Sequence, residues 1–385
     1  MLDLSYPPRK LNIGFISTRF AGTDGVSLET EKWAEVLNGF GHHCFYFSGE
    51  SDRPEEISMV VPEAHYRHPA VEAHHQQFFG HKKRKIDDTL WIHKETALLK
   101  ASLYEFITRY KIEVLIPENC LAIPLHIPLG LAITELIAET QISTIAHHHD
   151  FSWERKRFLV NNVWDYLSMA FPPTLHAIQH VTINSSGRHQ LARRKGVVST
   201  IIPNVMHFEK PAPGIDDYNQ DLRDSLGISK DQIFVLQPTR VVQRKGIEHA
   251  IELLARLEMD AVLVISHASG DEGYEYEKRL REYAEMMKVR TIFAADIFDE
   301  KRGRMPDGKK VYSLWDAYPH ADLITYPSLI EGFGNAFLEA VYFKKPIVVN
   351  NYTIYNIDIR TKGFRVIEFD DFITEETVAT TREVL

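Results

Sequence analysis

Short apolar runs alternate with amphipathic helical patterns along most of this chain, and that alternation constrains its fold more than any other feature. The run LNIGFIS (11–17), for example, precedes a helical pattern over 28–40. Strands that alternate with helices predict a parallel sheet covered on both faces. The alternation stops once, at the segment EKPAPGIDDYNQD (209–221), which is rich in proline, glycine and acidic residues. We therefore predict an α/β protein with two domains, residues 1–208 and 222–385, joined by that segment as a linker.

Charge and cysteine content exclude several classes of protein. The chain has 53 acidic and 44 basic residues and a net charge of −9, so we expect no nucleic-acid partner. Its two cysteines, Cys44 and Cys120, are too isolated for a disulfide scaffold or a zinc ribbon. The most apolar stretch, 121–138, contains two prolines, a histidine and a glutamate, so we expect no stable membrane insertion. With no signal peptide recognised at the N-terminus, we expect a cytoplasmic location.

The strongest functional motif is PSLIEGFGNAFLEA (327–340), which follows a predicted strand. Gly332 and Gly334 leave the backbone bare, so that amide groups can approach an anion, and the helix that begins next favours phosphate through its free amides. Two acids flank these glycines, and Glu339, inside the helix, could accept hydroxyl hydrogens of a ribose. The plainer interpretation is a glycine turn with an exposed helical acid. Because Glu331 and Glu339 both flank the glycines, we favour a nucleotide site.

A second motif, QPTRVVQRKG (237–246), also follows a predicted strand. Arg240 and Lys245 come directly before a predicted helix, where two cations suit a diphosphate. The alternative is a solvated basic turn, and for Arg244 we expect that alternative.

Together these motifs resemble the family 4 glycosyltransferases, which are retaining enzymes that use nucleotide sugars and have the GT-B fold of two facing Rossmann-like domains. The family's pattern of Glu, seven residues, Glu matches Glu331 to Glu339, and its Arg and Lys before the first helix of the second domain match Arg240 and Lys245. Further segments resemble the family more loosely: IIPNVMHF (201–208) and HHHDF (147–151).

The resemblance implies a role for each matched residue. Glu331 would contact hydroxyls of the donor sugar and Glu339 the ribose, while Arg240 and Lys245 would stabilise the leaving nucleoside diphosphate. His149 would hydrogen-bond the donor sugar near the reacting centre. The backbone that faces the sugar and the diphosphate would come from Gly332, Phe333, Gly334 and Asn335.

Other positions remain open between two interpretations. Gly22 and Gly25 follow the first strand and either approach the donor phosphate or form a plain turn, and the family usually has a tighter glycine pair there. His147 and His148 stand beside His149, but neighbours in a strand point to opposite faces. Adjacent histidines rarely have the spacing of zinc ligands, and the chain has no Asp-x-Asp motif. We therefore expect no metal ion.

The function that follows is transfer of a hexose from a nucleoside-diphosphate sugar, such as UDP-glucose or GDP-mannose, to a hydroxyl of a small acceptor of the sugar or sugar-acid type, with no other cofactor. We expect the base of the donor to bind near TIFAADIF (291–298). One alternative is a nucleotide-sugar epimerase of the same fold. Another is a nucleotide-sugar-binding protein that is inactive because the family's C-terminal cross-over helices are missing. That expectation arises because the sequence stops at TEETVATTREVL, within a helical pattern.

Overall fold

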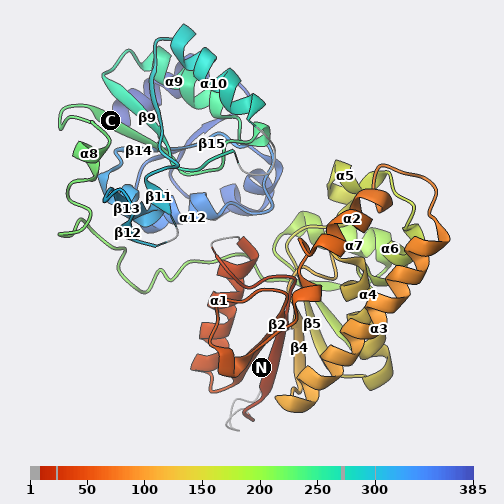
Figure 1. Ribbon diagram of the computed structural model, residues 1–385. Coiled ribbons are helices and arrows are strands. Elements are labelled where there is room, and N and C mark those ends of the chain that lie inside the picture. Colours follow the sequence, from red (N-terminus) through yellow and green to blue (C-terminus); the bar gives the residue numbers. More distant parts are fainter. Residues whose placement is uncertain (1–8, 23–24, 270–273, 300) are drawn as a thin grey trace. The chain divides into compact units, whose positions relative to one another are not determined.

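Two compact α/β units make up the protein, Met1–Pro203 and Asn204–Leu385. The computed structural model (Figure 1) describes residues 9–22, 25–269, 274–299 and 301–385. Each unit is built on one parallel sheet, which confirms the predicted α/β class with two Rossmann-like sheets. No helix or strand lies between residues 202 and 221, so the predicted linker is irregular backbone.

The sheet of the first unit has seven strands in the order β3-β2-β1-β4-β5-β6-β7, and all of its strand pairs are parallel. This order places β4 beside β5, so the loops that follow these two strands meet at the same edge of the sheet. The strands are β1 (Asn12–Ile16), β2 (His43–Ser48), β3 (Ser58–Val60), β4 (Val114–Pro117), β5 (Ser143–His148), β6 (Ile178–Thr182) and β7 (Ser199–Ile201).

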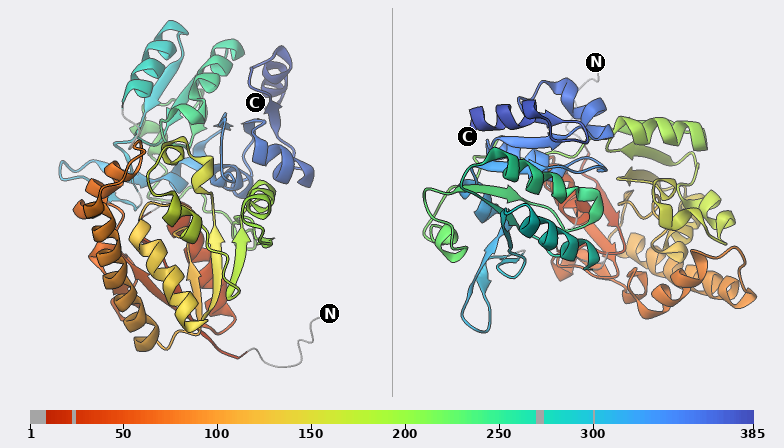
Figure 2. Two further views of the ribbon diagram at one scale, coloured as in Figure 1. Left: turned by 90° about the vertical axis from the view of Figure 1, so that its right-hand side faces the viewer. Right: turned by 90° about the horizontal axis from the view of Figure 1, so that it is seen from above.

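Helices cover both faces of this sheet because side chains alternate along its strands. Phe15 of β1 belongs to the core under α1 (Gly25–Gly39), whereas Ile16 belongs to the core under α3 (Ile86–Arg109) and α4 (Ile127–Thr140). The latter two helices lie side by side along the sheet (Figures 1 and 2). The other helices of this unit are α2 (Pro69–Phe78), α5 (Lys156–Leu159), α6 (Trp164–Ala170) and α7 (Ser185–Lys195).

The second unit has a six-stranded parallel sheet in the order β10-β9-β8-β14-β15-β16, and a three-stranded sheet in the order β11-β13-β12. Strand β8 therefore lies between β9 and β14, which brings three carboxyl ends together. The strands are β8 (Ile233–Gln237), β9 (Ala261–Ile265), β10 (Arg290–Phe293), β11 (Phe298–Asp299), β12 (Gly303–Arg304), β13 (Lys310–Ser313), β14 (Leu323–Tyr326), β15 (Ile347–Asn350) and β16 (Ile367–Phe369).

In this unit α9 (Ile247–Leu257) and α10 (Glu275–Met286) lie on one side of the six-stranded sheet, and α12 (Asn335–Tyr342) lies on the other (Figure 1). The last helix, α13 (Glu375–Val384), packs on α9 and β16, and its Val378 joins their core. The remaining helices are α8 (Leu222–Ser225) and α11 (Leu314–Ala317).

The segment VYSLWDAY (311–318) is divided between several elements. Its first residues belong to β13, Leu314–Ala317 form α11, and Tyr318 begins a 3-10 helix (Tyr318–His320). Ser313 ends the strand at the N-cap position of α11, and the Asp316 carboxylate reaches back to accept from its backbone N–H and its hydroxyl, at 2.8 and 3.0 Å. Among the residues that the structure describes, no helix is long and apolar enough to cross a membrane.

Candidate functional site

A contact between Lys245 and Glu331 is the centre of the candidate site in the second unit. The Lys245 ammonium group donates to Glu331 Oε1, and both side chains are almost buried, with 11% and 10% of their surface exposed. Lys245 ends a 3-10 turn (Gln243–Lys245) after β8, and Glu331 lies in the loop after β14. Because β8 and β14 are neighbours in the sheet, their carboxyl-end loops meet, as in other nucleotide-binding sheets.

Close backbone packing holds these two loops together. Gly246 has φ +57°, and a Cβ atom there would lie 2.5 Å from the carbonyl oxygen of Pro327, so only glycine fits. The backbone N–H of Leu329 also donates to the carbonyl oxygen of Arg244, at 2.8 Å. The position of Lys245 relative to Glu331 is therefore fixed by the backbone rather than by the two side chains alone.

The electrostatics favour an ionised Glu331. Burial alone would raise the pKa of this carboxyl, but the Lys245 and Arg244 cations hold that pKa below its usual value. Burial, together with the nearby Arg244 and Arg240 cations, lowers the pKa of Lys245 despite the charge of Glu331. A carboxylate held by cations can accept hydrogen bonds from sugar hydroxyls, and the cations beside it can meet a diphosphate.

The two arginines of this segment differ in exposure. Arg244 was expected to be solvated, and this is wrong: its Nη1 lies 3.5 Å from Glu331 Oε2 and donates to the carbonyl oxygen of Ile330, at 3.3 Å. Arg240 is exposed, so its guanidinium is available to a ligand. Its charge also contributes to the lowered pKa of the buried Lys245.

The glycine-rich loop leads directly into α12, whose first residue is Asn335. Gly334 has φ +131°, and a Cβ atom there would lie 2.4 Å from the hydroxyl oxygen of Tyr352. That hydroxyl donates to the carbonyl oxygen of Phe333, at 2.7 Å, so Tyr352 holds the loop in place. Gly332 is exposed next to this fixed backbone. The loop presents the helix N-terminus that an anionic ligand requires.

Glu339 lies on α12 and interacts with a buried tyrosine. The hydroxyl of Tyr318 donates to Glu339 Oε2, at 2.6 Å, and the Tyr318 side chain is fully buried. Because one hydrogen bond fixes one of its oxygens, the carboxylate of Glu339 is oriented before any ligand binds.

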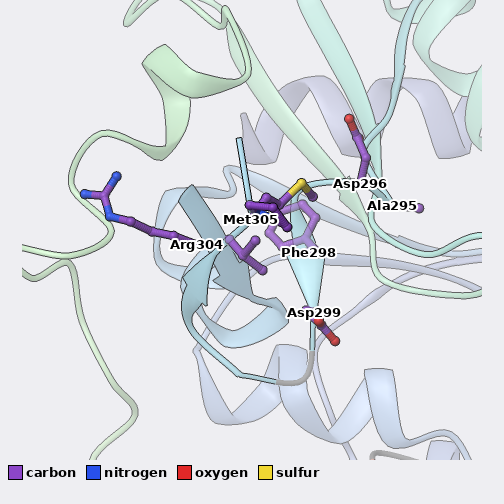
Figure 3. Close-up of a pocket in the computed structure, with 8 residues that line it drawn as sticks. Ala295, Asp296, Phe298, Asp299, Arg304 and Met305 are labelled. Atoms are coloured by element: carbon purple, nitrogen blue, oxygen red, sulfur yellow. The ribbon is translucent and has the colours of Figure 1, made fainter. Parts of the chain in front are cut away.

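The segment expected to hold the base contributes to a hollow of about 500 Å³. Figure 3 shows Phe298 and Met305 at its centre and Arg304 extending away from it. The wall also includes Ala295 and Asp296, from the segment after β10. The lining combines apolar side chains with charged ones, Asp296, Asp299 and Arg304.

Sequence reasoning missed three side chains of this site: Tyr318, Tyr352 and His267. His267 follows β9, and burial together with the Arg240 and Lys245 cations lowers its pKa to about 4, so it is neutral at pH 7. The signal that could have identified His267 is its position just after a strand. No sequence pattern marks Tyr318 or Tyr352, since each acts through a hydroxyl contact with a distant residue of the fold.

In the first unit the predicted glycines lie at the start of α1. Gly25 is the first residue of that helix, and the backbone N–H of Gly22 donates to Asp52 Oδ2, at 3.1 Å. The two residues between them lie outside the described part of the chain.

The three consecutive histidines separate onto two faces, as the alternation of a strand requires. His147 and His149 both turn towards Glu118. His147 Nδ1 lies 2.8 Å from Glu118 Oε2, and His149 Nε2 lies 3.5 Å from the same oxygen. His148 points the other way and pairs with His180, at 2.9 Å. Burial alone would lower the pKa of His149, but its interaction with the Glu118 carboxylate raises that pKa overall.

Glu118, directly after β4, is 1% exposed and interacts with His147 and His149. Burial favours a raised pKa for its carboxyl, and His147 and His149 hold the pKa below the usual value instead. Asn119 supports His149, whose backbone N–H donates to its side-chain oxygen at 3.0 Å.

The chain is similar to known glycosyltransferases in sequence and in fold. The family model described as "Glycosyl transferases group 1" matches residues 219–364. Mannosylglucosylglycerate synthase from Petrotoga mobilis is 33% identical over 93% of this chain and 86% of its own length. Mannosylglucosyl-3-phosphoglycerate synthase from the same organism is 28% identical over 56% of this chain and 42% of its own length.

A solved structure supports the fold. The crystal structure of a glycosyltransferase from Rickettsia africae superimposes with a TM-score of 0.65 at 15% identity, and the match covers 98% of this chain and 88% of the other. The predicted enzyme class, a glycosyltransferase that uses a nucleotide sugar, is confirmed. The chain belongs to the group 1 glycosyl transferases, the glycosyltransferase family 4 with the GT-B fold that its motifs resemble.

Proposed function

We propose that this enzyme transfers a mannosyl group from a nucleoside-diphosphate mannose to glucosylglycerate. The relative that matches along most of both chains is named for the product mannosylglucosylglycerate, which contains these parts. That product also has the small sugar-acid character that the sequence predicted for the acceptor. We further propose that the transfer retains the anomeric configuration and that the enzyme acts in the cytoplasm.

The contact between Lys245 and Glu331, placed beside the start of α12, carries the proposal. As the glycosidic bond breaks, negative charge grows on the leaving diphosphate, and interactions that strengthen with this charge accelerate the reaction. Lys245, Arg240 and the first amides of α12, which all belong to the second unit, would supply these interactions. We propose that these groups, and not a metal ion, neutralise the leaving group.

Glu331 and Glu339 would orient the donor. Glu331 would accept hydroxyl hydrogens of the sugar while its charge remains balanced by Lys245 and Arg244, and Glu339 would accept those of the ribose. His149 would donate to the transferred sugar, and the backbone around Gly22 and Gly25 would approach the acceptor or the phosphate. The hollow beside β10 would hold the base.

The test is to incubate the enzyme with GDP-mannose or UDP-glucose and one of two acceptors, glucosylglycerate or its 3-phosphate. Release of nucleoside diphosphate and the mass of the product are measured. We expect release from GDP-mannose with glucosylglycerate and a product that retains the α configuration by NMR. Turnover only with the 3-phosphate would overturn the proposal that glucosylglycerate is the acceptor. Turnover without any acceptor would support an epimerase instead.

Variants test the site separately from the acceptor. Glu331→Gln and Lys245→Ala should each lower kcat/KM at least about a hundredfold. Arg256→Ala is the matched control, because it breaks ion pairs with Glu252 and Glu375 at the opposite end of α9. If Lys245→Ala kept the activity of the Arg256→Ala control, the assignment of the site would be wrong. Nucleotide binding in calorimetry with no turnover for any acceptor would favour a binding protein.

A further inference from the structure

Asn204 and Asn335 form a hydrogen bond within the second unit, although 131 positions separate them in the chain. The side-chain Nδ2 of Asn204 donates to Asn335 Oδ1, at 2.9 Å. Asn204 is the first residue of this unit and is 6% exposed, whereas Asn335 is the first residue of α12 and is partly buried. The residue that begins the second unit therefore contacts the start of the helix that follows the glycine-rich loop.

This hydrogen bond determines which atom of Asn335 is available to a ligand. A carboxamide carries an acceptor oxygen and a donor NH₂ group on opposite sides. Because Asn335 Oδ1 accepts from Asn204, the Nδ2 group of Asn335 is directed away from Asn204. No described residue accepts a hydrogen bond from this Nδ2, and the atom is not enclosed by the fold. Asn335 therefore offers a neutral side-chain donor to a ligand.

The backbone at the start of α12 adds further donors beside this side chain. Gly334 occupies the N-cap position, and no side chain caps the helix. The backbone N–H groups of Phe337 and Leu338 both donate to the carbonyl oxygen of Gly334, whereas those of Asn335 and Ala336 have no acceptor among the described residues. The start of α12 therefore places three donor groups, one from a side chain and two from the backbone, where an anion is favoured.

The opposite orientation of the pair would not suit an anion. If Asn204 accepted the hydrogen bond instead, Asn335 would present its carbonyl oxygen, which a phosphate oxygen repels. Asn204 makes no other hydrogen bond within the described part of the chain, and its Oδ1 is buried without a partner. Either orientation would leave one atom of Asn204 unpaired, so the ligand at Asn335 decides which orientation is more stable. A bound diphosphate selects the observed one.

We propose that Asn335 donates a side-chain hydrogen bond to the diphosphate of the donor, and that Asn204 is the positioning residue that orients its carboxamide. This inference rests on the proposed function, since it concerns the same nucleotide-sugar site. A neutral donor adds no charge beside the buried Lys245, and its hydrogen bond strengthens as negative charge grows on the leaving diphosphate. The pair therefore supports the charged groups already assigned to this step.

Binding of GDP and of UDP is measured by calorimetry, and the nucleotide that the unaltered chain binds is then used for every variant. Asn335→Asp still accepts from Asn204, and the start of a helix tolerates its charge, but it replaces the donor with a carboxylate. We expect its Kd to rise at least about a hundredfold, because like charges then meet. Asn335→Ala removes the donor alone and should raise Kd about tenfold. Gln220→Glu, the control, adds the same charge at an exposed residue before α8 and should bind like the unaltered chain.

Variants of Asn204 test positioning. Asn204→Leu has nearly the same size but cannot form the hydrogen bond, so the Asn335 carboxamide is free to rotate and Kd should rise about fivefold. In the Asn335→Ala background the same change should have no further effect on Kd, because no carboxamide remains to be oriented. Asn204→Ser replaces Asn204→Leu if circular dichroism shows that the leucine variant does not fold.

The outcomes separate this inference from the proposed function. If the unaltered chain binds neither nucleoside diphosphate, the proposed function is wrong, and the role of the pair is overturned with it. If the unaltered chain binds one of them and Asn335→Asp binds it as tightly, only the role of the pair is overturned. An equal effect of Asn204→Leu with and without the Asn335 side chain overturns the positioning role of Asn204.

Discussion

The ammonium group of Lys245 contacts the carboxylate of Glu331, although 86 positions separate the two residues in the chain. Replacing Glu331 leaves the buried Lys245 ammonium without its carboxylate, and replacing Lys245 leaves the Glu331 carboxylate with only the more distant Arg244, at 3.5 Å. Lys245→Met should therefore lower the free energy of unfolding by on the order of 3 kcal/mol, measured by urea denaturation. Glu331→Gln should cost less, because a neutral amide still accepts a hydrogen bond from the lysine.

The double variant separates the pair from its surroundings. Lys245→Met with Glu331→Gln should be more stable than the sum of the two single losses predicts, since neither side chain is then left as an unpaired charge. Strict additivity would contradict a direct interaction between these two residues.

Tyr318 positions Glu339 through a single hydroxyl. Tyr318→Phe removes the 2.6 Å hydrogen bond and leaves the ring in place. If Glu339 binds the ribose, we expect the KM for the nucleotide sugar to rise about fivefold with kcat nearly unchanged, as measured by steady-state kinetics. Tyr312→Phe is the matched control, because this buried tyrosine donates to Asp221, at 2.9 Å, in another part of the unit. An equal rise in KM for both variants would contradict a positioning role.

Two constraints act on Gly334, its positive φ and the nearby hydroxyl of Tyr352, and a comparison with Gly308 separates them. Alanine there meets both a φ of +131° and the hydroxyl oxygen of Tyr352, whereas alanine at Gly308 meets only a φ of +86° with open space around it. Gly308→Ala should lower the free energy of unfolding by about 1 kcal/mol and Gly334→Ala by about 3 kcal/mol, in thermal or urea unfolding. Adding Tyr352→Phe to the Gly334→Ala variant should restore part of the stability lost at Gly334, because it removes the hydroxyl oxygen that the alanine meets. Similar losses for the two alanine variants would contradict the close approach of Tyr352.

Sequence reasoning succeeded where a pattern repeats or a motif stays local. The alternation of strands and helices determines both parallel sheets, and the loops after β8 and β14 carry Lys245 and Glu331 to one edge because those strands are neighbours. Sequence reasoning failed where a contact depends on the packing of distant elements. Tyr318 is separated from Glu339 by 21 positions, and no periodicity marks its hydroxyl as the donor to that carboxylate.

The histidine segment shows the same limit in more detail. Alternation along a strand correctly divided three adjacent histidines between two faces. It did not indicate that Glu118, on the neighbouring strand, would meet His147 and His149, because the pairing of β4 with β5 is a property of the sheet. The contacts of Arg244 were missed for a similar reason. The residues around this arginine do not indicate where the loop after β14 lies.

His126 caps α4 in a way that requires a neutral imidazole. Its Nδ1 accepts a hydrogen bond from the backbone N–H of Leu129, at 3.1 Å, and its Nε2–H donates to the carbonyl oxygen of Glu63, at 2.8 Å. A proton on Nδ1 would abolish the first bond. Burial, with a smaller contribution from the neighbouring His68 and His65, lowers the pKa of His126 from 6.5 to about 4.

The sign of the pH dependence follows from this lowered pKa. Between pH 6.5 and 4 the unfolded chain binds a proton at His126 that the folded chain does not bind, so the stability of the fold falls as the pH falls through this window. The shift to about 4 corresponds to roughly 3 kcal/mol, lost in full only near pH 4 and below. His126→Asn keeps an acceptor for the helix end but has no proton to gain. We therefore expect urea denaturation of this variant at pH 7, 6, 5 and 4.5 to show a shallower loss of stability than the unaltered chain. The exposed His189→Asn control should retain the full slope, and an equal slope in His126→Asn would exclude His126 as a source of acid sensitivity.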